Sequence, residues 1–256
     1  MTVEPIRSRG NAQLKRARRL QAKKHRLADG RFLAEGEDLV EEALAGGQLP
    51  VETFVAAERP PDPGLVARVE RGGPVHVVDD ALLGELGSLG HPARIIGVFA
   101  LDRLPRRDAA ATLGVYLYRV IDPGNVGTVV RAAGALGPAF VALSPGCSDP
   151  LSGKGVRASM GAVFHVPIET AADPPAVGRR IALVAAGGRP LWEEPLVEPV
   201  TFVVGAERDG LPEDVVDACD ARCTIPQAAG AESLNAAQAA TCALYEAVRQ
   251  RAGRTG

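Results

Sequence analysis

Short apolar runs alternate with amphipathic stretches along the whole chain. In the first part, apolar runs predict strands, and apolar side chains spaced three and four positions apart predict helices between them. Asn11 is a suitable N-cap and Gly30 a suitable stop for the first helix. The predicted strands are 51–58, 74–79 and 94–101, and the predicted helices are 11–30, 36–47, 64–71 and 79–87. This alternation indicates a small α/β domain of about 100 residues.

A second α/β region follows a stretch typical of a linker, 102-DRLPRRDAAATLG-114. Its predicted strands are 113–121, 139–144, 181–187, 200–207 and 221–226, and its predicted helices are 125–136, 153–160, 213–219 and 233–252. Because these strands are apolar almost throughout, we expect a mostly parallel sheet covered on both faces. The fold class expected is therefore α/β, with domains at 1–104 and 113–256 and a linker at 105–112.

Composition narrows the class of protein. The hydrophobic content of 46% suffices for a full core, and no apolar run approaches the length that spans a membrane. Charged residues precede any apolar stretch at the N-terminus, so we expect a cytoplasmic protein without a secretory signal. The cysteines and histidines show no metal-site spacing and no triad pattern, and we expect no metal. They are Cys147, Cys219, Cys223, Cys242, His25, His76, His91 and His165.

The net charge of −2 conceals a strong asymmetry along the chain. Residues 1–31 hold ten Lys and Arg against two acidic residues, a balance of +8, and the remainder carries −10. Such a block is a candidate contact for a polyanion. A solvated helix face or a loose tail explains the same composition, and composition alone leaves both interpretations open.

The segment 122-DPGNVGTVVRAAGALG-137 follows one apolar run and precedes another. A strand, a glycine-rich turn and a helix in that order are typical of nucleotide-binding sites, because backbone N–H groups at a helix start attract anions. Both the dinucleotide fingerprint and the P-loop pattern are absent, which argues against a nicotinamide-dependent enzyme. Taken alone, the segment is better explained as a structural turn, with Arg131 as an exposed helix residue.

Two later segments also carry polar residues just after predicted strands. In 202-FVVGAERDGLP-212, Glu207 follows a strand end, where open α/β sheets bind ligands. In 224-TIPQAAGAESLNAAQAA-240, Ser233 is the expected N-cap of a long helix, with Leu234 and Asn235 in its first turn. Each segment alone has an ordinary structural explanation, a solvated glutamate or a helix cap.

Together and in this order, the three segments resemble the three motifs of the SpoU/TrmH family of RNA 2′-O-ribose methyltransferases, whose catalytic domain is a trefoil-knotted (SPOUT) α/β fold. Between them, 148-SDPLSGKGVRASMGAVFHVP-167 is similar to the family's substrate-side segment. Residues 6–44 resemble the N-terminal substrate-binding domain of the rRNA-directed members, which has a fold like ribosomal protein L30e. The resemblance covers nearly the whole chain.

This resemblance implies transfer of a methyl group from S-adenosylmethionine to a ribose 2′-hydroxyl of RNA, with 23S rRNA as the expected substrate. It also implies a homodimer, because in the family a partner subunit completes the active site. The extra N-terminal domain favours rRNA over tRNA. A tRNA methyltransferase of the same family and a non-catalytic RNA-binding or ribosome-assembly protein remain the alternatives.

Matching positions assign roles to single residues. Arg131 matches the family's catalytic arginine; a guanidinium keeps its proton in proteins, so we expect it to bind a phosphate and stabilise the developing alkoxide rather than act as a base. Asn125 and Glu207 are the other expected catalytic residues, holding Arg131 or a loop in place. The expected cofactor-binding residues, in loops 203–207, 225–230 and 233–235, are Val204, Gly205, Ile225, Pro226, Ser233, Leu234 and Asn235. The expected RNA-backbone contacts are Lys15, Arg16, Arg19, Lys23 and Arg157.

Two departures from the family pattern concern the substrate side. Arg131 is followed by Ala132 and Ala133, where many members carry Thr after the arginine. Arg119, just before the first motif, stands where members often have a different polar residue. Neither departure removes an expected catalytic group, but both leave the contacts with the substrate open.

Overall fold

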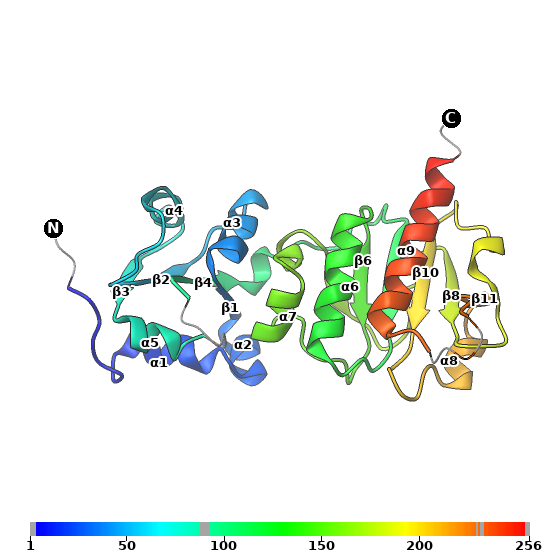
Figure 1. The fold of residues 1–256 in the computed structure, drawn as a ribbon, viewed down its shortest axis with the longest axis horizontal. Coiled ribbons are helices and arrows are strands. Elements are labelled where there is room, and N and C mark those ends of the chain that lie inside the picture. Colours follow the sequence, from blue (N-terminus) through cyan, green and yellow to red (C-terminus); the bar gives the residue numbers. More distant parts are fainter. Residues whose placement is uncertain (1–3, 88–92, 229, 231–232, 254–256) are drawn as a thin grey trace. The chain divides into compact units, whose positions relative to one another are not determined.

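The computed structural model describes residues 4–87, 93–228, 230 and 233–253, and the chain divides into two compact units (Figure 1). Unit 1 consists of Met1–Leu104 and Asp149–His165, and unit 2 of Pro105–Ser148 and Val166–Gly256. His91, one of the dispersed histidines, and position 229 of the expected cofactor loop lie outside the described residues. Within the described part of the chain, no helix has the length and apolar character that a membrane crossing requires.

Unit 1 is built on a four-stranded mixed sheet with strand order β1-β4-β2-β3. Strand β4 pairs antiparallel with β1 and β2, and β2 pairs parallel with β3. The strands are β1 (Arg31–Glu35), β2 (Glu52–Ala56), β3 (Val75–Val78) and β4 (Ile95–Ala100). The helices are α1 (Ala12–Arg19), α2 (Lys23–Asp29), α3 (Glu37–Ala45), α4 (Pro63–Val69), α5 (Asp80–Gly84) and α7 (Gly153–Ala158), with 3-10 turns at Leu101–Arg103 and Ala162–Phe164.

Helices cover both faces of this sheet. Phe54 and Val55 are neighbours on β2, and because successive side chains of a strand point to opposite faces, they enter two different cores. Phe54 packs with Leu14 of α1 and with residues of α5, whereas Val55 packs with residues of α3 and α4. Unit 1 is therefore a three-layer α/β/α domain, and the α/β class that the alternation of elements predicted is confirmed.

The helix predicted over 11–30 is two helices. Asn11 caps α1 through bonds from the N–H groups of Gln13 and Leu14, and Gly30 ends α2 at φ +61°, so both predicted ends are confirmed. The interruption follows from tertiary contacts. The buried Arg26 guanidinium donates to the carbonyls of Leu20 and Gln21 at 2.8 Å each, which satisfies acceptors that the break leaves without helical partners.

Unit 2 is built on a seven-stranded sheet with strand order β7-β6-β5-β10-β8-β11-β9, and every pairing between its described strands is parallel. The strands are β5 (Leu113–Leu117), β6 (Phe140–Leu143), β7 (Ile168–Thr170), β8 (Arg179–Leu183), β9 (Arg189–Pro190), β10 (Val200–Val204) and β11 (Ala221–Thr224). The helices are α6 (Pro123–Ala135), α8 (Glu213–Asp217) and α9 (Ala236–Ala252), with a 3-10 turn at Leu191–Glu193. The expected α/β fold with a mostly parallel sheet is confirmed.

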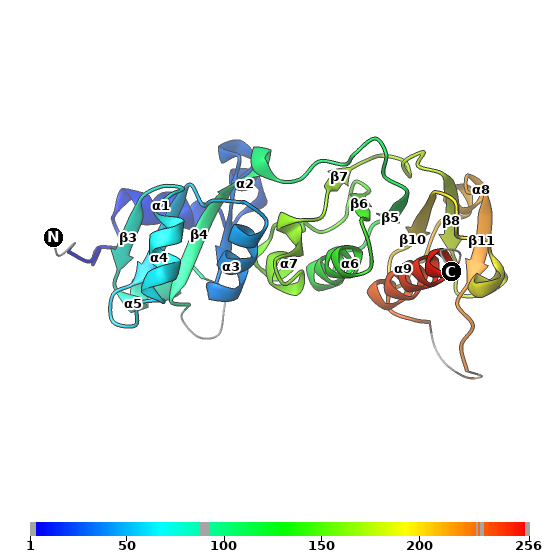
Figure 2. The same ribbon diagram turned by 90° about the horizontal axis from the view of Figure 1, so that it is seen from above.

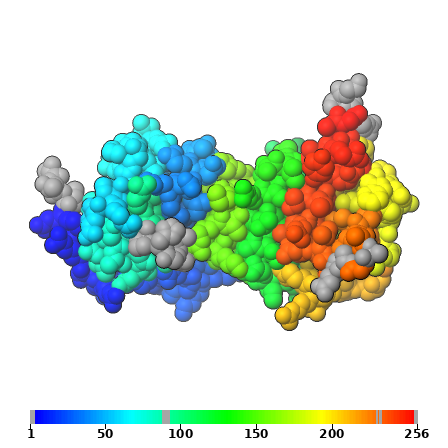
Figure 3. Space-filling model, in the orientation of Figure 1, coloured from blue at the N-terminus to red at the C-terminus, as the bar shows by residue number. Residues whose placement is uncertain are grey.

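Helices α6 and α9 lie side by side on one face of this sheet (Figures 1 and 2). Helix α6 packs on β5 and β6, and α9 packs on β10 while its outer side reaches the surface of the unit (Figure 3). On the other face, Val215 of α8 packs against the core cluster of Tyr116, Phe140, Ala142 and Val203. Cover on both faces explains why β5 and β10 are buried at every position.

Three strands were not predicted: β1, β7 and β9. Strands β7 and β9 have three and two residues and lie at the two edges of the sheet of unit 2. Strand β1 lies at an edge of the other sheet, with charged residues at both ends. Such short edge strands owe their conformation to pairing with a neighbour, and their own hydrophobic pattern is too short to predict them.

Candidate functional site

The carboxyl ends of β8, β10 and β11 meet at one edge of the parallel sheet, and a cavity of about 270 Å³ lies there. Five of the expected cofactor-binding residues line it: Val204, Gly205, Ile225, Ser233 and Leu234. The other two lie nearby but outside this lining. Pro226 lines a hollow beside Trp192, and Asn235 lines a second cavity.

The lining also contains residues that the sequence did not single out. They come from the end of β8 and the segment after it, from the loop 206–210, from the segment after β11 and from the start of α9. The additional lining residues are Leu183, Val184, Ala185, Ala206, Arg208, Asp209, Gly210, Gln227, Ala236 and Ala239. The end of β8 could have been expected, since β8 is a predicted parallel strand and ligands bind beyond such strand ends.

Gly205 allows the loop after β10 to fold back onto the strand end. A Cβ at position 205 would lie 2.2 Å from the carbonyl carbon of Gly210, a backbone atom that cannot swing away. The N–H of Gly210 donates to the carbonyl of Ala206 at 3.0 Å, which closes the loop. The glycine is therefore required by close backbone approach, and its φ is not in the left-handed region.

One chain of hydrogen bonds joins all three motif segments. The Asn125 side-chain amide donates to Glu207 Oε1 at 2.7 Å, and the Asn235 amide donates to Asn125 Oδ1 at 3.1 Å. Asn125 stands in the first turn of α6, where Asp122 is the N-cap. Asn125 and Asn235, which lie 110 positions apart in the sequence, are thus bonded directly to each other. We call this the Glu207–Asn125–Asn235 chain.

Asn235, and not Ser233, is the N-cap of α9. Its Oδ1 accepts from the N–H of Ala237 at 2.8 Å, and its own N–H donates to Gln238 Oε1 at 3.2 Å. This reciprocal pair is a capping box, so the helix begins at Ala236, two residues later than a Ser233 cap would place its start. Ser233 is exposed and lines the first cavity instead.

Arg131 stands apart from this chain within its own subunit. It lies on the exposed face of α6, one turn after Thr128, and lines neither cavity. Its guanidinium forms no hydrogen bond or ion pair with any residue that the structure describes. The structure therefore brings Asn125 and Glu207 together and leaves the Arg131 guanidinium available for an external partner.

A second cavity, of about 740 Å³, adjoins the first. The two cavities share the loop residues 206–210, so Glu207 borders both. Asn125 and Asn235 lie on the second cavity, together with Tyr118, Arg119 and Ile121 from the segment after β5. Tyr118 and Ile121 could not be chosen from the sequence, because both belong to the apolar run 113–121, which predicts a strand.

The described part of the chain shows neither an activated thiol at Cys219 or Cys223 nor a group of metal ligands. Burial raises the pKa of Cys223 to about 11 and also raises that of Cys219, so both stay as thiols near neutral pH. Burial likewise raises the pKa of Tyr116 to about 12, and the Tyr116 hydroxyl donates to the carbonyl of Ala172. Among described residues, no three His, Cys, Asp or Glu side chains are grouped to hold a metal ion.

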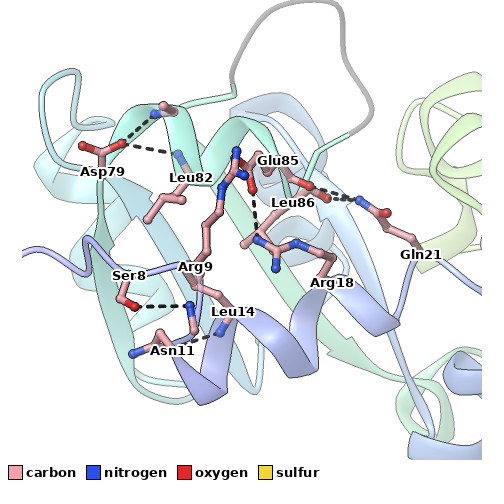
Figure 4. A network of polar contacts seen from close by, with 12 residues as sticks. Ser8, Arg9, Asn11, Leu14, Arg18, Gln21, Asp79, Leu82, Glu85 and Leu86 are labelled. Atoms are coloured by element: carbon pink, nitrogen blue, oxygen red, sulfur yellow. Dashed lines mark hydrogen bonds and ion pairs between the residues drawn. The ribbon is translucent and has the colours of Figure 1, made fainter.

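The basic residues of α1, of α2 and of the segment before α1 fall into two groups. Arg9 and Arg18 both pair with Glu85, and Gln21 donates to the Glu85 and Leu86 carbonyls (Figure 4). Arg26 is buried and pairs with Asp149. These cations are engaged within unit 1, and they therefore hold the α1–α2 segment in place.

The four residues of these helices expected to contact RNA are exposed: Lys15, Arg16, Arg19 and Lys23. Arg16 lies 3.7 Å from Glu52, and Arg19 contacts the His25 ring at 3.1 Å. Arg157 of α7 differs from them, because its side chain is only 28% exposed and faces Glu35 at 3.5 Å. The exposed Lys15 and Lys23 are thus the cations best able to meet a phosphate backbone.

The chain is similar to known proteins over most of its length. Residues 112–245 match the model of the SpoU rRNA Methylase family, and residues 11–97 match the MRM3-like substrate binding domain. The chain is 33% identical to an uncharacterized tRNA/rRNA methyltransferase of Synechocystis, covering 97% of this chain and 95% of the relative. It is 30% identical to a 23S rRNA (guanosine(2553)-2′-O)-methyltransferase of Bacillus subtilis, covering 95% and 98%.

Solved structures show the same similarity. The AdoMet-bound rRNA methyltransferase from Sinorhizobium meliloti superposes with a TM-score of 0.81 at 32% identity, covering 96% of this chain and 98% of that one. The SpoU methyltransferase AviRb from Streptomyces viridochromogenes, in complex with AdoMet, also gives 0.81, at 28% identity over 94% and 98%. The similarity therefore extends over both units.

Proposed function

The chain belongs to the SpoU rRNA methylase family, and from this we propose that it transfers the methyl group of S-adenosylmethionine to a ribose 2′-hydroxyl of 23S rRNA. The observation that carries the proposal is the Glu207–Asn125–Asn235 chain, which ties the three motif segments together between two adjoining cavities. Relatives named as 23S rRNA 2′-O-methyltransferases support the choice of RNA.

The first cavity fits the cofactor. Its walls at Gly205, Ile225 and Leu234 are small or apolar, which suits an adenine ring, and the glycine brings the backbone of loop 206–210 close to the strand end. Val204 and Ser233 complete the walls, while Pro226 and Asn235 support the loops from outside the cavity. When bound, S-adenosylmethionine supplies an electrophilic methyl group on a sulfonium centre.

Positioning and electrostatics are the tasks left to the protein. Arg131 binds a phosphate next to the acceptor ribose and stabilises the alkoxide that develops as the 2′-oxygen loses its proton to phosphate or water. Asn125 and Glu207 hold the loops at the border of the two cavities, where the acceptor oxygen must approach. Correct placement of two reactants can supply about 7–11 kcal/mol of barrier reduction.

The position of Arg131 supports a homodimer. In its own subunit this residue is exposed and lines neither cavity, which agrees with a site presented to it by a second copy of the chain. Unit 2 also carries an apolar hollow at the surface where a partner could pack. Trp192 and Tyr245, with exposed fractions of 57% and 58%, line it beside Leu136 and Cys242.

We expect the wild-type protein to be a dimer in solution and Tyr245→Glu to be a monomer. A carboxylate buried in an apolar interface without a partner costs several kcal/mol. Size-exclusion chromatography with light scattering measures the mass. Arg222→Ala, which removes an exposed ion-paired arginine of the same unit, should leave the dimer intact. A monomeric wild-type protein, or a dimeric Tyr245→Glu variant, would refute this interface.

Gly205→Ala should weaken binding of S-adenosylmethionine at least about tenfold. The added methyl group meets the Gly210 backbone at 2.2 Å, so loop 206–210 must move away from the cavity. Isothermal calorimetry measures the affinity, and thermal unfolding measures any loss of stability. Gly253→Ala is the matched control, since a Cβ there meets its nearest neighbours at an ordinary 3.7 Å. Unchanged affinity in the Gly205 variant would place the cofactor elsewhere.

Replacing Lys15 and Lys23 by Glu should weaken RNA binding most at low salt. Each lost phosphate contact lowers the slope of log affinity against log salt by about one unit. Filter binding to 23S rRNA fragments at several salt concentrations measures this slope. Arg18→Gln is the control, because Arg18 already pairs with Glu85. A slope equal to wild type in the double variant would mean that this helix face does not contact RNA.

The same proposal includes the domain boundaries and the cellular location. The family matches at 11–97 and 112–245 support an RNA-binding domain over 1–104, a linker at 105–112 and a methyltransferase domain over 113–256. We also attribute to the catalytic domain the trefoil knot of the family. A ribosomal RNA substrate supports action in the cytoplasm, and we propose RNA contacts at Arg157, Arg16 and Arg19 in addition to the two lysines.

The test is incubation of the purified protein with labelled S-adenosylmethionine and, separately, 23S rRNA, 16S rRNA and bulk tRNA. We expect label in 23S rRNA at one nucleotide, located by a reverse-transcription stop. Label in tRNA alone would favour the tRNA-directed alternative. An absence of label in every RNA, with cofactor binding intact, would favour a non-catalytic RNA-binding protein.

A further inference from the structure

Arg119 has a backbone conformation that is unusual for a residue with a side chain. Among the described residues, only Arg119 and Met160 are non-glycine residues with positive φ, and Arg119 has φ 53°. This conformation crowds the Cβ atom, so it persists only where neighbouring contacts enforce it. Here the N–H of Arg119 donates to the hydroxyl of Ser144 at 2.9 Å, and Ser144 is buried.

The surroundings of Arg119 fix its side chain at the rim of the second cavity. Its guanidinium carbon lies 5.9 Å from the centroid of the Tyr118 ring, within reach of a cation–π contact. On the other side is Gly146, where a Cβ would touch the Arg119 stem at 3.7 Å. Arg119, Tyr118 and Gly146 all line the cavity. The strained backbone therefore serves to hold a cation beside an aromatic ring at one place.

Ile121 adds an apolar surface to the same cavity. Its side chain is 71% exposed, the largest exposure among the large apolar residues that the structure describes as exposed. Tyr118 is half-buried, so one part of its ring packs on the core while the rest borders the cavity. An aromatic ring, a branched aliphatic group and a cation around about 740 Å³ make a site of the size and chemistry that binds a nucleotide.

The location of this cavity connects it to the proposed reaction. It shares loop 206–210 with the proposed cofactor cavity, and the Glu207–Asn125–Asn235 chain lies on its border. A ribose at that border would have its base and phosphate on the side of Tyr118 and Arg119. Bases that leave the helical stack of RNA are typically held on aromatic side chains and on arginine.

We propose that the second cavity binds the acceptor nucleotide of the RNA in an unpaired, unstacked state. Tyr118 and Ile121 contact its base, and Arg119 binds its phosphate. This rests on the proposed function and goes beyond it by naming the residues that select an unpaired nucleotide.

The decisive experiment is a thermodynamic cycle between the base and the cavity. Two synthetic 23S rRNA fragments span the mapped nucleotide; one is normal, and the other has an abasic ribose there that keeps its 2′-hydroxyl. We measure kcat/KM of methyl transfer for wild type, Tyr118→Ala and Ile121→Ala. In wild type, base removal should cost about five- to a hundredfold, the range of base stacking on an aromatic side chain. In Tyr118→Ala and Ile121→Ala, removal of the base should lower kcat/KM only slightly further, because these variants have already lost the contact with the base.

A second variant separates binding from folding. Arg119→Gly removes the guanidinium but suits the positive φ, so the protein should unfold at the same or a higher temperature. We expect the KM for RNA to rise about tenfold or more, as for the loss of a charge-assisted contact, with the affinity for S-adenosylmethionine unchanged. Arg222→Ala, at an exposed arginine away from both cavities, should leave KM unchanged.

Several results would overturn the proposal. If base removal does not change kcat/KM in wild type, the base lies elsewhere. The same conclusion follows if base removal lowers kcat/KM by the same factor in the variants as in wild type. Weaker cofactor binding in Arg119→Gly would assign this cavity to the cofactor. If wild type methylates no RNA at all, the proposed function fails and this proposal fails with it, whereas normal wild-type transfer with multiplying losses overturns this proposal alone.

Discussion

Arg131→Ala is expected to lower the rate of methyl transfer about 10²–10³-fold, the loss typical for removal of one group that stabilises a developing oxyanion. The affinity for S-adenosylmethionine should stay close to wild type, because Arg131 does not line the proposed cofactor cavity. Single-turnover transfer to 23S rRNA measures the first quantity, and calorimetry measures the second. A guanidinium keeps its proton, so the loss should be of similar size across the neutral pH range.

The activity of mixed dimers, formed from two different variants, tests whether Arg131 acts in the site of its own subunit or in that of the partner. At a limiting concentration of S-adenosylmethionine, the Arg131→Ala and Gly205→Ala homodimers should both be strongly impaired, but a mixed dimer contains one site with both parts intact if Arg131 acts across the interface. Statistical mixing should then restore roughly a quarter of wild-type activity. No recovery would mean that Arg131 acts within its own subunit. A cofactor affinity that collapses in Arg131→Ala would contradict the assigned role.

Asn125→Asp is expected to have the second large effect, although it leaves the number of heavy atoms at the site unchanged. The Asn125 amide donates to Glu207 at 2.7 Å, and the substitution replaces this donor by a second carboxylate at the same distance. Two such carboxylates cannot both be ionised at low cost. We expect activity to fall about a hundredfold at neutral pH, with weaker cofactor binding, since Glu207 borders the cofactor cavity.

The activity of Asn125→Asp should depend on pH, because the two neighbouring carboxylates can share one proton. At lower pH one carboxylate of the pair becomes protonated and can donate again, so the activity of Asn125→Asp relative to wild type should rise as pH falls. The double variant Asn125→Asp/Glu207→Gln restores a donor–acceptor pair with the direction reversed, and should recover cofactor affinity and thermal stability. If the double variant binds the cofactor no better than Asn125→Asp, the hydrogen bond is not what positions the loop.

The hydrophobic pattern predicted most elements because unit 2 buries its strands on both faces. Runs such as 113–121 and 200–207 contain β5 and β10, whose residues are all buried. The break between α1 and α2 could not be predicted, since it depends on the Arg26 guanidinium binding two carbonyls while it pairs with Asp149, more than a hundred residues away. Local propensity does not contain such a contact.

The site was predictable in its parts and not in its assembly. The motifs named Asn125, Glu207 and Asn235, but no sequence pattern says that their side chains form one hydrogen-bonded chain. For the cap of α9 a signal was present: Gln238 stands three residues after Asn235, which is capping-box spacing, whereas Ser233 has Ala236 at that place. Tyr118 and Ile121 gave no signal, because their role depends on a cavity formed by distant loops.

The chemical position of the methyl group tests the central claim most directly. 23S rRNA labelled by the wild-type protein is hydrolysed with alkali, which cleaves next to every free 2′-hydroxyl but not next to a methylated one. We predict that the label appears in an alkali-resistant dinucleotide of a single sequence, and that Arg131→Ala yields almost none. Label in mononucleotides would mean methylation of a base, and would contradict ribose 2′-O-methylation at this site.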